Sequence, residues 1–449
     1  YQYGKNGRIE EVKNPRGYRS VKNTYDDKRR ITHQEFADGG SMKFDYDDTK
    51  RQVILTERNQ SKITYIHDNK YRNTETIYPD GTREKNEYNA KNQRTLYVDR
   101  NGNQTKMSYD DRGNITQIIN ALGEKTNLTY NAFNKLISIK TNGKEKLKNS
   151  YDTKGNLIAT KEADGKSNKK TYDEKGRPVE IEAPDQSITK LIYDERGNIT
   201  KVIENDQTTI KYKYDSLNRV TETTDGNKNT THYTYNKADK IIRVENPLGS
   251  VRTYSYNESG KITKITDYDQ NSIKAEYNEI GKISRVADKE GQSTLYTYDK
   301  MWEISEITHA DGGTIKNKYD QNNRLSEQTL PEGGVISYTY DPNGNITTKT
   351  DAEGNTTKYK YDGLDRIKSI TDPAGSKTEY TYDAEGNITT KTDAEGNKTT
   401  YTYDEMGRCT SKTNVMGQTT TFNYDALGYV TKIQKPNGTT EERKYKNGR

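Results

Sequence analysis

The chain has few of the residues that most often build catalytic, metal-binding and disulfide-bonded sites. Its 449 residues include one cysteine, one tryptophan and four histidines. A single cysteine cannot form an internal disulfide, which excludes a disulfide framework. The histidines are His33, His67, His232 and His309, and none lies in a metal-binding spacing such as H-E-x-x-H. We therefore expect no metal, no cofactor and no enzymatic activity.

Long hydrophobic runs and blocks of like charge are also missing. Only 28% of the residues are hydrophobic, and no apolar run approaches the roughly 20 residues that cross a membrane. The 73 basic and 67 acidic residues are finely mixed and leave a net charge of +6. These features predict neither membrane insertion nor nucleic-acid binding. The first ten residues, YQYGKNGRIE, do not resemble a signal peptide.

What the chain does have is a tyrosine every 21 residues. From Tyr25 to Tyr445 this marker position is tyrosine in every repeat except one, which has His67, and Asp or Asn nearly always follows it. A fixed period of this length is typical of a repeat protein. We therefore expect residues 1–449 to form one continuous array of about 21 repeats. Residues 1–100 are more degenerate, residues 101–449 are regular, and both ends fall within a repeat.

Each repeat contains two turns of the D-x-x-G kind between short stretches rich in Thr, Ile, Val and Tyr. Those stretches predict β-strands, and no helical periodicity is present. In the first turn, Asp follows the marker and can accept hydrogen bonds from backbone two residues on. The fourth residue after the marker supplies the left-handed conformation of a three-residue hairpin loop. The glycines that we predict to hold this structural turn are Gly113, Gly155, Gly197, Gly344, Gly386 and Gly407.

Such a loop places the marker tyrosine opposite the sixth residue after it, which is apolar in most repeats. The second residue before the marker is often tyrosine too, while the residue between them is polar. Because successive side chains of a strand point to opposite faces, one face of the sheet should be aromatic and the other polar and exposed to solvent. Cys409 occupies the sixth position and is expected to act as a small core hydrophobe. The tyrosines that we predict to form this structural ladder are Tyr109, Tyr151, Tyr172, Tyr193, Tyr214, Tyr298, Tyr340, Tyr382, Tyr403 and Tyr424.

The odd length of the repeat requires one extra residue. Side chains alternate with a period of two, and two three-residue loops preserve the face, so a repeat should have an even length. The next apolar position after the sixth is the ninth, an odd step. We therefore predict a β-bulge between these two positions, or else a second turn that differs by one residue.

The fold class that follows is all-β, a repetitive antiparallel hairpin strip wound as a spiral shell or tube. About 44 strands at ~4.8 Å give a strip roughly 210 Å long, with a width of about 20 Å. An exposed tyrosine–isoleucine face would aggregate, so the strip should coil to cover it. The coil can be narrow and filled by its own side chains, or wide with a lumen.

Trp302 is the one candidate contact residue, and it departs from the repeat pattern. It occupies the turn position where glycine belongs, and a bulky residue with positive φ is unusual. Either the turn is rebuilt or the indole is an exposed contact residue, and the rebuilt turn is the preferred interpretation. The recurring Asp and Glu of the turns could suggest calcium loops or paired acids, but turn chemistry already explains them.

The unit Y-D-x-x-G-N/R-I/L resembles the RHS/YD-repeat family. The resemblance covers the whole chain and is most specific at Tyr193–Ile199 (YDERGNI), Tyr340–Ile346 (YDPNGNI) and Tyr382–Ile388 (YDAEGNI). It implies a spiral β-sheet shell like those of Tc-toxin cocoons, bacterial Rhs and wall-associated proteins, and teneurins. In several of these the shell encloses a C-terminal effector. The family's self-cleaving core segment and variable toxin domain have no counterpart in this sequence.

The leading hypothesis is a non-enzymatic shell or scaffold of a secreted or surface-exposed bacterial protein, of the polymorphic-toxin kind. Its partners would be an enclosed effector domain or neighbouring copies assembled end to end. The alternative is an extracellular adhesin or filament-forming surface protein that binds cells or glycans through its repeat face.

Overall fold

The computed structural model describes residues 1–4, 7–13 and 19–445. All regular elements among them are β-strands, 43 in number, and they form one sheet. Each strand pairs antiparallel with the next one along the chain, from β1 to β43. The predicted all-β strip of consecutive hairpins is confirmed.

The strands of the first half of the chain are β1 (Gln2–Tyr3), β2 (Ile9–Lys13), β3 (Arg19–Tyr25), β4 (Ile31–Phe36), β5 (Ser41–Asp47), β6 (Gln52–Thr56), β7 (Lys62–His67), β8 (Asn73–Ile77), β9 (Arg83–Tyr88), β10 (Arg94–Val98), β11 (Gln104–Tyr109), β12 (Ile115–Ile119), β13 (Lys125–Tyr130), β14 (Leu136–Thr141), β15 (Lys144–Tyr151), β16 (Leu157–Glu162), β17 (Ser167–Tyr172), β18 (Pro178–Glu182), β19 (Ile188–Tyr193), β20 (Ile199–Glu204), β21 (Gln207–Tyr214) and β22 (Val220–Asp225).

Those of the second half are β23 (Thr230–Tyr235), β24 (Ile241–Glu245), β25 (Val251–Tyr256), β26 (Ile262–Thr266), β27 (Ser272–Tyr277), β28 (Ile283–Ala287), β29 (Ser293–Tyr298), β30 (Ile304–Thr308), β31 (Thr314–Tyr319), β32 (Leu325–Thr329), β33 (Val335–Tyr340), β34 (Ile346–Thr350), β35 (Thr356–Tyr361), β36 (Ile367–Thr371), β37 (Lys377–Tyr382), β38 (Ile388–Thr392), β39 (Lys398–Tyr403), β40 (Cys409–Thr413), β41 (Thr419–Tyr424), β42 (Val430–Gln434) and β43 (Thr440–Glu442).

The extra residue of the repeat is a bulge just after the first turn. Tyr109 at the end of β11 faces Ile115, as predicted, but the preceding Ser108 faces Gln117, so Thr116 has no counterpart on β11. The same shift recurs along the strip; for example, Tyr340 faces Ile346 while Thr339 faces Thr348. The predicted bulge between the sixth and ninth positions is therefore confirmed.

One repeat accommodates its extra residue in the turn instead of the strand. Tyr46 faces Val53, its seventh residue, and the ladder between β5 and β6 has no shift. The left-handed residue there is Arg51, with φ of 54°, and not Lys50, which stands at the glycine position. A longer turn and a bulge thus both take up the one extra residue of the 21-residue repeat, so that the side chains stay on their faces of the sheet.

The sheet has a thin core. In β37 the side chains alternate between exposed and half-buried, and the marker Tyr382 is on the half-buried face. Among the described residues, Ala287 is the only hydrophobic one that is fully buried. The strip is therefore held by its hydrogen-bonded ladders and by half-buried aromatic contacts more than by a deep apolar interior.

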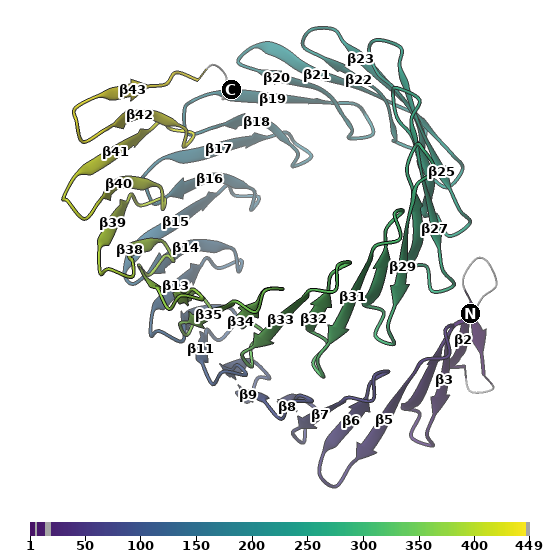
Figure 1. The fold of residues 1–449 in the computed structure, drawn as a ribbon. Coiled ribbons are helices and arrows are strands. Elements are labelled where there is room, and N and C mark those ends of the chain that lie inside the picture. The colour runs from purple at the N-terminus through teal and green to yellow at the C-terminus, as the bar shows by residue number, and fades with distance from the viewer. Residues whose placement is uncertain (5–6, 14–18, 446–449) are drawn as a thin grey trace.

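The strip winds into a wide spiral, and strands β33–β42 lie beside β9–β19 of the preceding winding (Figure 1). Asn322 contacts Asp80, 242 residues earlier, and Asn343 contacts Asp99, 244 residues earlier. One winding therefore takes about eleven and a half repeats, or ~23 strands, which at ~4.8 Å each gives a circumference of roughly 110 Å. Of the two coils that the sequence allowed, the structure has the wide one.

Candidate functional site

The first turn of each repeat is fixed by the aspartate that follows the marker. Asp110 Oδ1 accepts hydrogen bonds from the backbone N–H groups of Arg112 (3.0 Å) and Asn114 (2.9 Å), and its Oδ2 accepts one from Asn114 Nδ2 (2.8 Å). The Asn114 side chain and these N–H groups stabilise the carboxylate and hold the pKa of Asp110 below its usual value.

Glycine at the fourth position takes a positive φ in each predicted turn. In the turn after Tyr109, Gly113 N donates to Asp110 O at 3.1 Å. At φ near 90° a side chain is more strained than in the left-handed region where Asn is found. The φ values are 95° at Gly113, 85° at Gly155, 90° at Gly197, 98° at Gly344, 91° at Gly386 and 76° at Gly407.

Each marker tyrosine of the predicted ladder also makes a hydrogen bond that the sequence reasoning missed. Its hydroxyl donates to the backbone carbonyl 15 residues earlier, at the sixth position of the preceding repeat. The distances are 2.7 Å for Tyr109, 2.9 Å for Tyr151, 2.8 Å for Tyr172, 2.7 Å for Tyr193, 2.6 Å for Tyr214, 2.7 Å for Tyr298, 2.7 Å for Tyr340, 2.6 Å for Tyr382, 2.8 Å for Tyr403 and 2.7 Å for Tyr424.

This bond explains why the marker is tyrosine and not phenylalanine. The ladder that joins β10 to β11 ends at Leu96 and Lys106, so the Arg94 carbonyl lies beyond it. Tyr109 bridges the opening through its hydroxyl, and the ring covers the step between repeats. The chain has 37 tyrosines and only 4 phenylalanines, an imbalance that could have indicated a hydroxyl with a fixed partner.

An arginine at the fifth position couples neighbouring repeats in another way. Arg177 donates from Nε to Asp173 Oδ2 at 2.7 Å and stacks over the ring of Tyr193, 4.5 Å from its centroid. Arg366 does the same with Asp362 and with Tyr382. Such cation–π contacts add to the ladder wherever Arg replaces the usual Asn.

Trp302 does not rebuild its turn, so that preferred interpretation is wrong. Trp302 has a φ of 66° and keeps the standard turn, with its backbone N–H donating to Asp299 O at 3.1 Å. Its indole Nε1 donates to Asp38 Oδ2 at 2.8 Å, in the preceding winding. Trp302 is thus a contact residue, and its partner belongs to the same chain.

The surroundings of Trp302 form a clasp of four residues: Phe36, Asp38, Arg58 and Trp302. The Arg58 guanidinium lies 4.1 Å from the centroid of the indole and 5.2 Å from that of Phe36, and it pairs with Asp38. Phe36 meets the indole edge-on at 5.2 Å. Arg58 is only 4% exposed. A buried, stacked arginine joined to one carboxylate makes this an enclosed contact between the windings.

The clasp belongs to a longer seam in which second turns of one winding meet first turns of the next. Asn343 Nδ2 donates to Asp99 Oδ2 at 2.9 Å, and Asn101 N donates to Asn343 Oδ1 at 3.1 Å. Further along, Lys146 forms an ion pair with Glu385 at 2.6 Å. We call this set of contacts, from Asp38–Trp302 to Asp164–Arg408, the seam. It closes the wall between successive windings.

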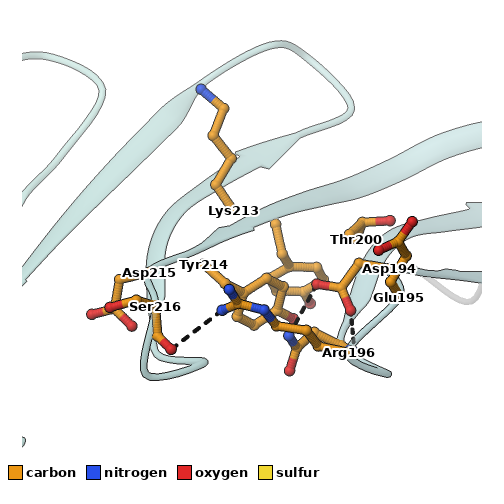
Figure 2. A pocket seen from close by; sticks show the side chains of 10 residues that line it. Asp194, Glu195, Arg196, Thr200, Lys213, Tyr214, Asp215 and Ser216 are labelled. Carbon is orange, nitrogen blue, oxygen red and sulfur yellow. Dashed lines mark hydrogen bonds between the residues drawn. The ribbon is translucent and has the colours of Figure 1, made fainter.

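A shallow groove of about 660 Å³ runs between two consecutive first turns. Figure 2 shows its acids and Arg196 gathered near the turns, with Lys213 pointing away from them. Asp194 is engaged by Asn198, and Arg196 Nη1 donates to Ser216 O at 3.2 Å. Asp194 and Arg196 thus serve the turns, while Lys213 forms an ion pair with Glu222 of the neighbouring strand at 2.7 Å.

Metal-binding clusters and membrane-spanning helices are both absent from the described residues. Within residues 1–4, 7–13 and 19–445, no three or more His, Cys, Asp or Glu side chains gather where they could hold a metal ion. The same residues contain no helix whose length and hydropathy suit a membrane span. Cys409 lies half-buried at the start of β40, and burial raises the pKa of its thiol.

The fold and seam define a repetitive β-sheet wall, and comparisons with known proteins identify its family. The Teneurin YD-shell model matches residues 84–209. The RHS Repeat model matches residues 193–231, 235–270, 319–356, 340–377, 361–398, 382–415 and 407–440. The chain is therefore a member of the RHS/YD-repeat family. No curated protein matches the chain over its sequence.

Solved structures of toxin complexes share the fold. The TcdB2–TccC3 crystal structure has a TM-score of 0.71 at 15% identity, and the TcdB2–TccC3–Cdc42 structure has 0.70 at 15%. The Tc holotoxin pore of Photorhabdus luminescens with a mutated TccC3 has 0.69 at 13%. These alignments cover 93%, 93% and 96% of this chain but only 27%, 26% and 30% of the other chains. The chain thus spans little more than a quarter of their length, and the likeness shows a shared fold.

Proposed function

We propose that the chain is a wall segment of a shell that encloses an effector segment, in a secreted or surface-exposed bacterial protein. The observation that carries this proposal is the seam. The strip bends far enough for second turns to meet first turns about 242 residues later. A strip that closes on itself makes a continuous wall, whereas an open ribbon would leave its edges to solvent.

The wall would act by exclusion and not by catalysis. Its backbone ladder runs without interruption through consecutive strands, and the tyrosine hydroxyls bridge the places where ladders open. The seam adds side-chain hydrogen bonds between windings, so a protease would have to separate two rows of turns to pass. The similarity to toxin shells supports the fold of such a container, while the enclosed segment is our inference.

The test is protease protection of the natural sequence downstream of Arg449, expressed together with this chain. We expect the downstream segment to survive a protease concentration that digests it when it is released by denaturant. A seam variant, Asp38→Ala with Trp302→Ala, should lose this protection, while Asp111→Ala, an exposed turn residue outside the seam, should keep it. Prompt digestion of the downstream segment beside an intact wall would refute the proposal.

A second candidate is an adhesin, and one observation favours it. Several large apolar side chains are exposed at turn tips, including Tyr71 at 83%, Phe133 at 79% and Leu248 at 89%. Exposed apolar residues at protein surfaces can mark contact sites. The chain alone should then bind cells or immobilised glycans, and Tyr71→Ser with Phe133→Ser should abolish that binding. Absence of binding by the wild-type chain would remove this candidate.

A further inference from the structure

The coiled strip has two edges, a row of first turns and a row of second turns, and the seam covers only part of each. Second turns between residues 36 and 165 contact first turns between 299 and 408. First turns before residue 299 therefore form a rim at one end of the coil, which includes those between residues 26 and 197. Second turns after residue 165 form a rim at the opposite end, which includes those between residues 288 and 396 (Figure 1).

The first-turn rim carries a row of exposed cations between residues 26 and 197, interrupted at Thr49 and Phe133. Exposed acids stand beside them at the second position of several turns, namely Asp27, Asp48, Asp111, Glu174 and Glu195. The cations are the third residues after the marker, and all are exposed at the turn tips. They are Lys28, Lys70, Lys91, Arg112, Lys154, Lys175 and Arg196. Several reach toward the next turn along the rim; for example, Arg112 Nη1 donates to Asn131 O at 2.9 Å. We call this row the basic rim.

The same position carries no cation where the turn is covered by the seam. There it is Met301, Asn322, Asn343, Leu364, Glu385 or Met406. The turn geometry is the same in both rows, because Gly113 and Gly344 both donate to their aspartate carbonyl at 3.1 Å. The turn itself therefore does not require lysine or arginine. The first turns between residues 215 and 281 also lack a cation at this position, where they have Leu217, Ala238, Ser259 and Ile280, so the cations are confined to the first part of the rim.

The opposite rim is acidic. The thirteenth residue after the marker is an exposed carboxylate in most of its second turns. These residues are Glu290, Asp311, Glu332, Glu353 and Glu395. We call this row the acidic rim. In the seam the same position already receives a first turn, because Asp80 accepts a hydrogen bond from Asn322, a third-position residue.

We infer that the acidic rim of one copy docks on the basic rim of a second copy, so that coils stack head to tail. Contacts within the seam show how the rims would dock, because there an acid at the thirteenth position contacts a side chain at the third position. Both rows of side chains repeat every 21 residues around the same circumference. Each exposed ion pair is weak and screened by salt, but a row of them acts together. The contact joins two different surfaces and does not close on itself, so it generates open stacks. This inference goes beyond the enclosed effector and does not depend on it.

Analytical ultracentrifugation of the full chain tests the inference. We expect association that grows with protein concentration at about 20 mM salt and disappears at about 500 mM, where the screening length falls to a few ångström. Neutralising the basic rim with Lys70→Gln, Lys91→Gln and Arg112→Gln should give a monomer.

The acidic rim has a matching variant and a mixing experiment. Glu332→Gln, Glu353→Gln and Glu395→Gln should also give a monomer. An equimolar mixture of the two neutralised variants should form dimers and nothing larger, because each dimer uses the one intact rim of each partner.

A charge swap separates rim docking from other modes of association. Reversing all six residues in one chain, to Glu on the basic rim and Lys on the acidic rim, should restore stacking. Unchanged circular dichroism and Trp302 fluorescence show that the variants keep their fold. A wild-type chain that stays monomeric in low salt overturns the inference, even if its basic rim binds a polyanion such as heparin. The inference is also overturned if the charge-reversed chain stays monomeric. Association that does not depend on the salt concentration overturns it as well, because it would indicate pairing of strand edges.

Discussion

The indole Nε1 of Trp302 donates a hydrogen bond to Asp38 Oδ2 at 2.8 Å, although 264 residues of chain separate them. This bond ties the turn after β29 to the turn after β4, in the preceding winding. Because Trp302 is the only tryptophan in the chain, its fluorescence reports on the seam alone. Winding and unfolding of the sheet can therefore be observed separately.

Removing the carboxylate of the clasp should open the seam and leave the sheet intact. In Asp38→Ala, the buried Arg58 loses its ion-pair partner and the indole loses its acceptor. Leaving a buried charged group unpaired costs on the order of 3–5 kcal/mol. We expect Trp302 emission to shift to longer wavelength and to be quenched more strongly by acrylamide, with an unchanged β-sheet circular dichroism spectrum.

The control for this prediction is Asp111→Ala, which removes a fully exposed carboxylate from a turn outside the seam. Its Trp302 emission should match that of the wild type. Identical emission from Asp38→Ala and the wild type would mean that the windings do not touch through the clasp in solution.

The features that the sequence predicted correctly are local. The pairing of Tyr109 with Ile115 follows from the loop length, and the bulge at Thr116 follows from the parity of a 21-residue repeat. Both depend on residues within half a repeat of each other, so the pattern alone contains them. The hydroxyl bond of Tyr109 to Arg94 lies only 15 residues away, and it was missed because the tyrosine was treated as a hydrophobic residue.

The seam could not be predicted, because it depends on how curvature accumulates over eleven repeats. Trp302 shows the consequence: local geometry argued for a rebuilt turn, yet Arg58 and Asp38 from the preceding winding hold the indole where it is. Gly363 is a second case. A Cβ on Gly363 would lie 3.4 Å from Ala121 and from Leu122, a restriction invisible within its own repeat.

Replacing marker tyrosines by phenylalanine should weaken the wall in proportion to the number replaced. Each hydroxyl satisfies one carbonyl at the step between repeats, and a hydrogen bond of this kind contributes about 0.5–1.5 kcal/mol. We expect Tyr340→Phe, Tyr382→Phe and Tyr403→Phe to be nearly additive in urea unfolding, because each contacts a different carbonyl.

Tyr380 provides the matched control, because it lies in the same strand as Tyr382 and its hydroxyl makes no hydrogen bond to the described residues. Tyr380→Phe should leave the free energy of unfolding within about 0.5 kcal/mol of the wild type. Equal losses for Tyr380→Phe and Tyr382→Phe would contradict a specific role of the marker hydroxyl.

The glycine of the first turn should be hard to replace. Gly344 has a φ of 98°, where a Cβ is strained, so Gly344→Val should cost at least the roughly 1–2 kcal/mol of a left-handed non-glycine residue. Arg29 occupies the same position with a φ of 73°, so Arg29→Gly should be neutral or stabilising. Thermal unfolding followed by circular dichroism measures both, and opposite signs are the expected result.

Acid should loosen the turns that are held by aspartate carboxylates. Hydrogen bonds from the Arg72 side chain lower the pKa of Asp68 to about 2, and Asn114 and Asn156 lower the pKa values of Asp110 and Asp152. A carboxyl group with a depressed pKa in the folded state stabilises the fold above its unfolded pKa of 3.8. That contribution is lost as the pH falls from about 4 towards 2.

Asparagine variants test this assignment because asparagine already serves in other first turns, where Asn131 Oδ1 accepts from Phe133 N at 2.9 Å and from Lys135 N at 3.0 Å. Asp110→Asn with Asp152→Asn should therefore fold and show a smaller drop in melting temperature between pH 4 and pH 2 than the wild type. Asp111→Asn, at an exposed turn tip, should retain the full drop. Parallel acid profiles for all three proteins would assign the pH dependence to other groups.

Alkali should unfold the wall in a step that coincides with the ionisation of its half-buried tyrosines. Burial, together with the nearby Glu84 carboxylate, raises the pKa values of Tyr78 and Tyr97 to about 12. A phenol whose pKa is raised in the folded state stabilises the fold fully below its unfolded value of 10.0, and the contribution is lost as the pH rises towards 12.

Tyrosinate absorbance should thus rise in two phases, first from exposed phenols and then together with the loss of circular dichroism. Glu84→Gln should move part of the second phase to lower pH, because it removes a negative charge beside both rings. A single phase near pH 10 with the sheet intact would show that Tyr78 and Tyr97 are not held as the structure describes.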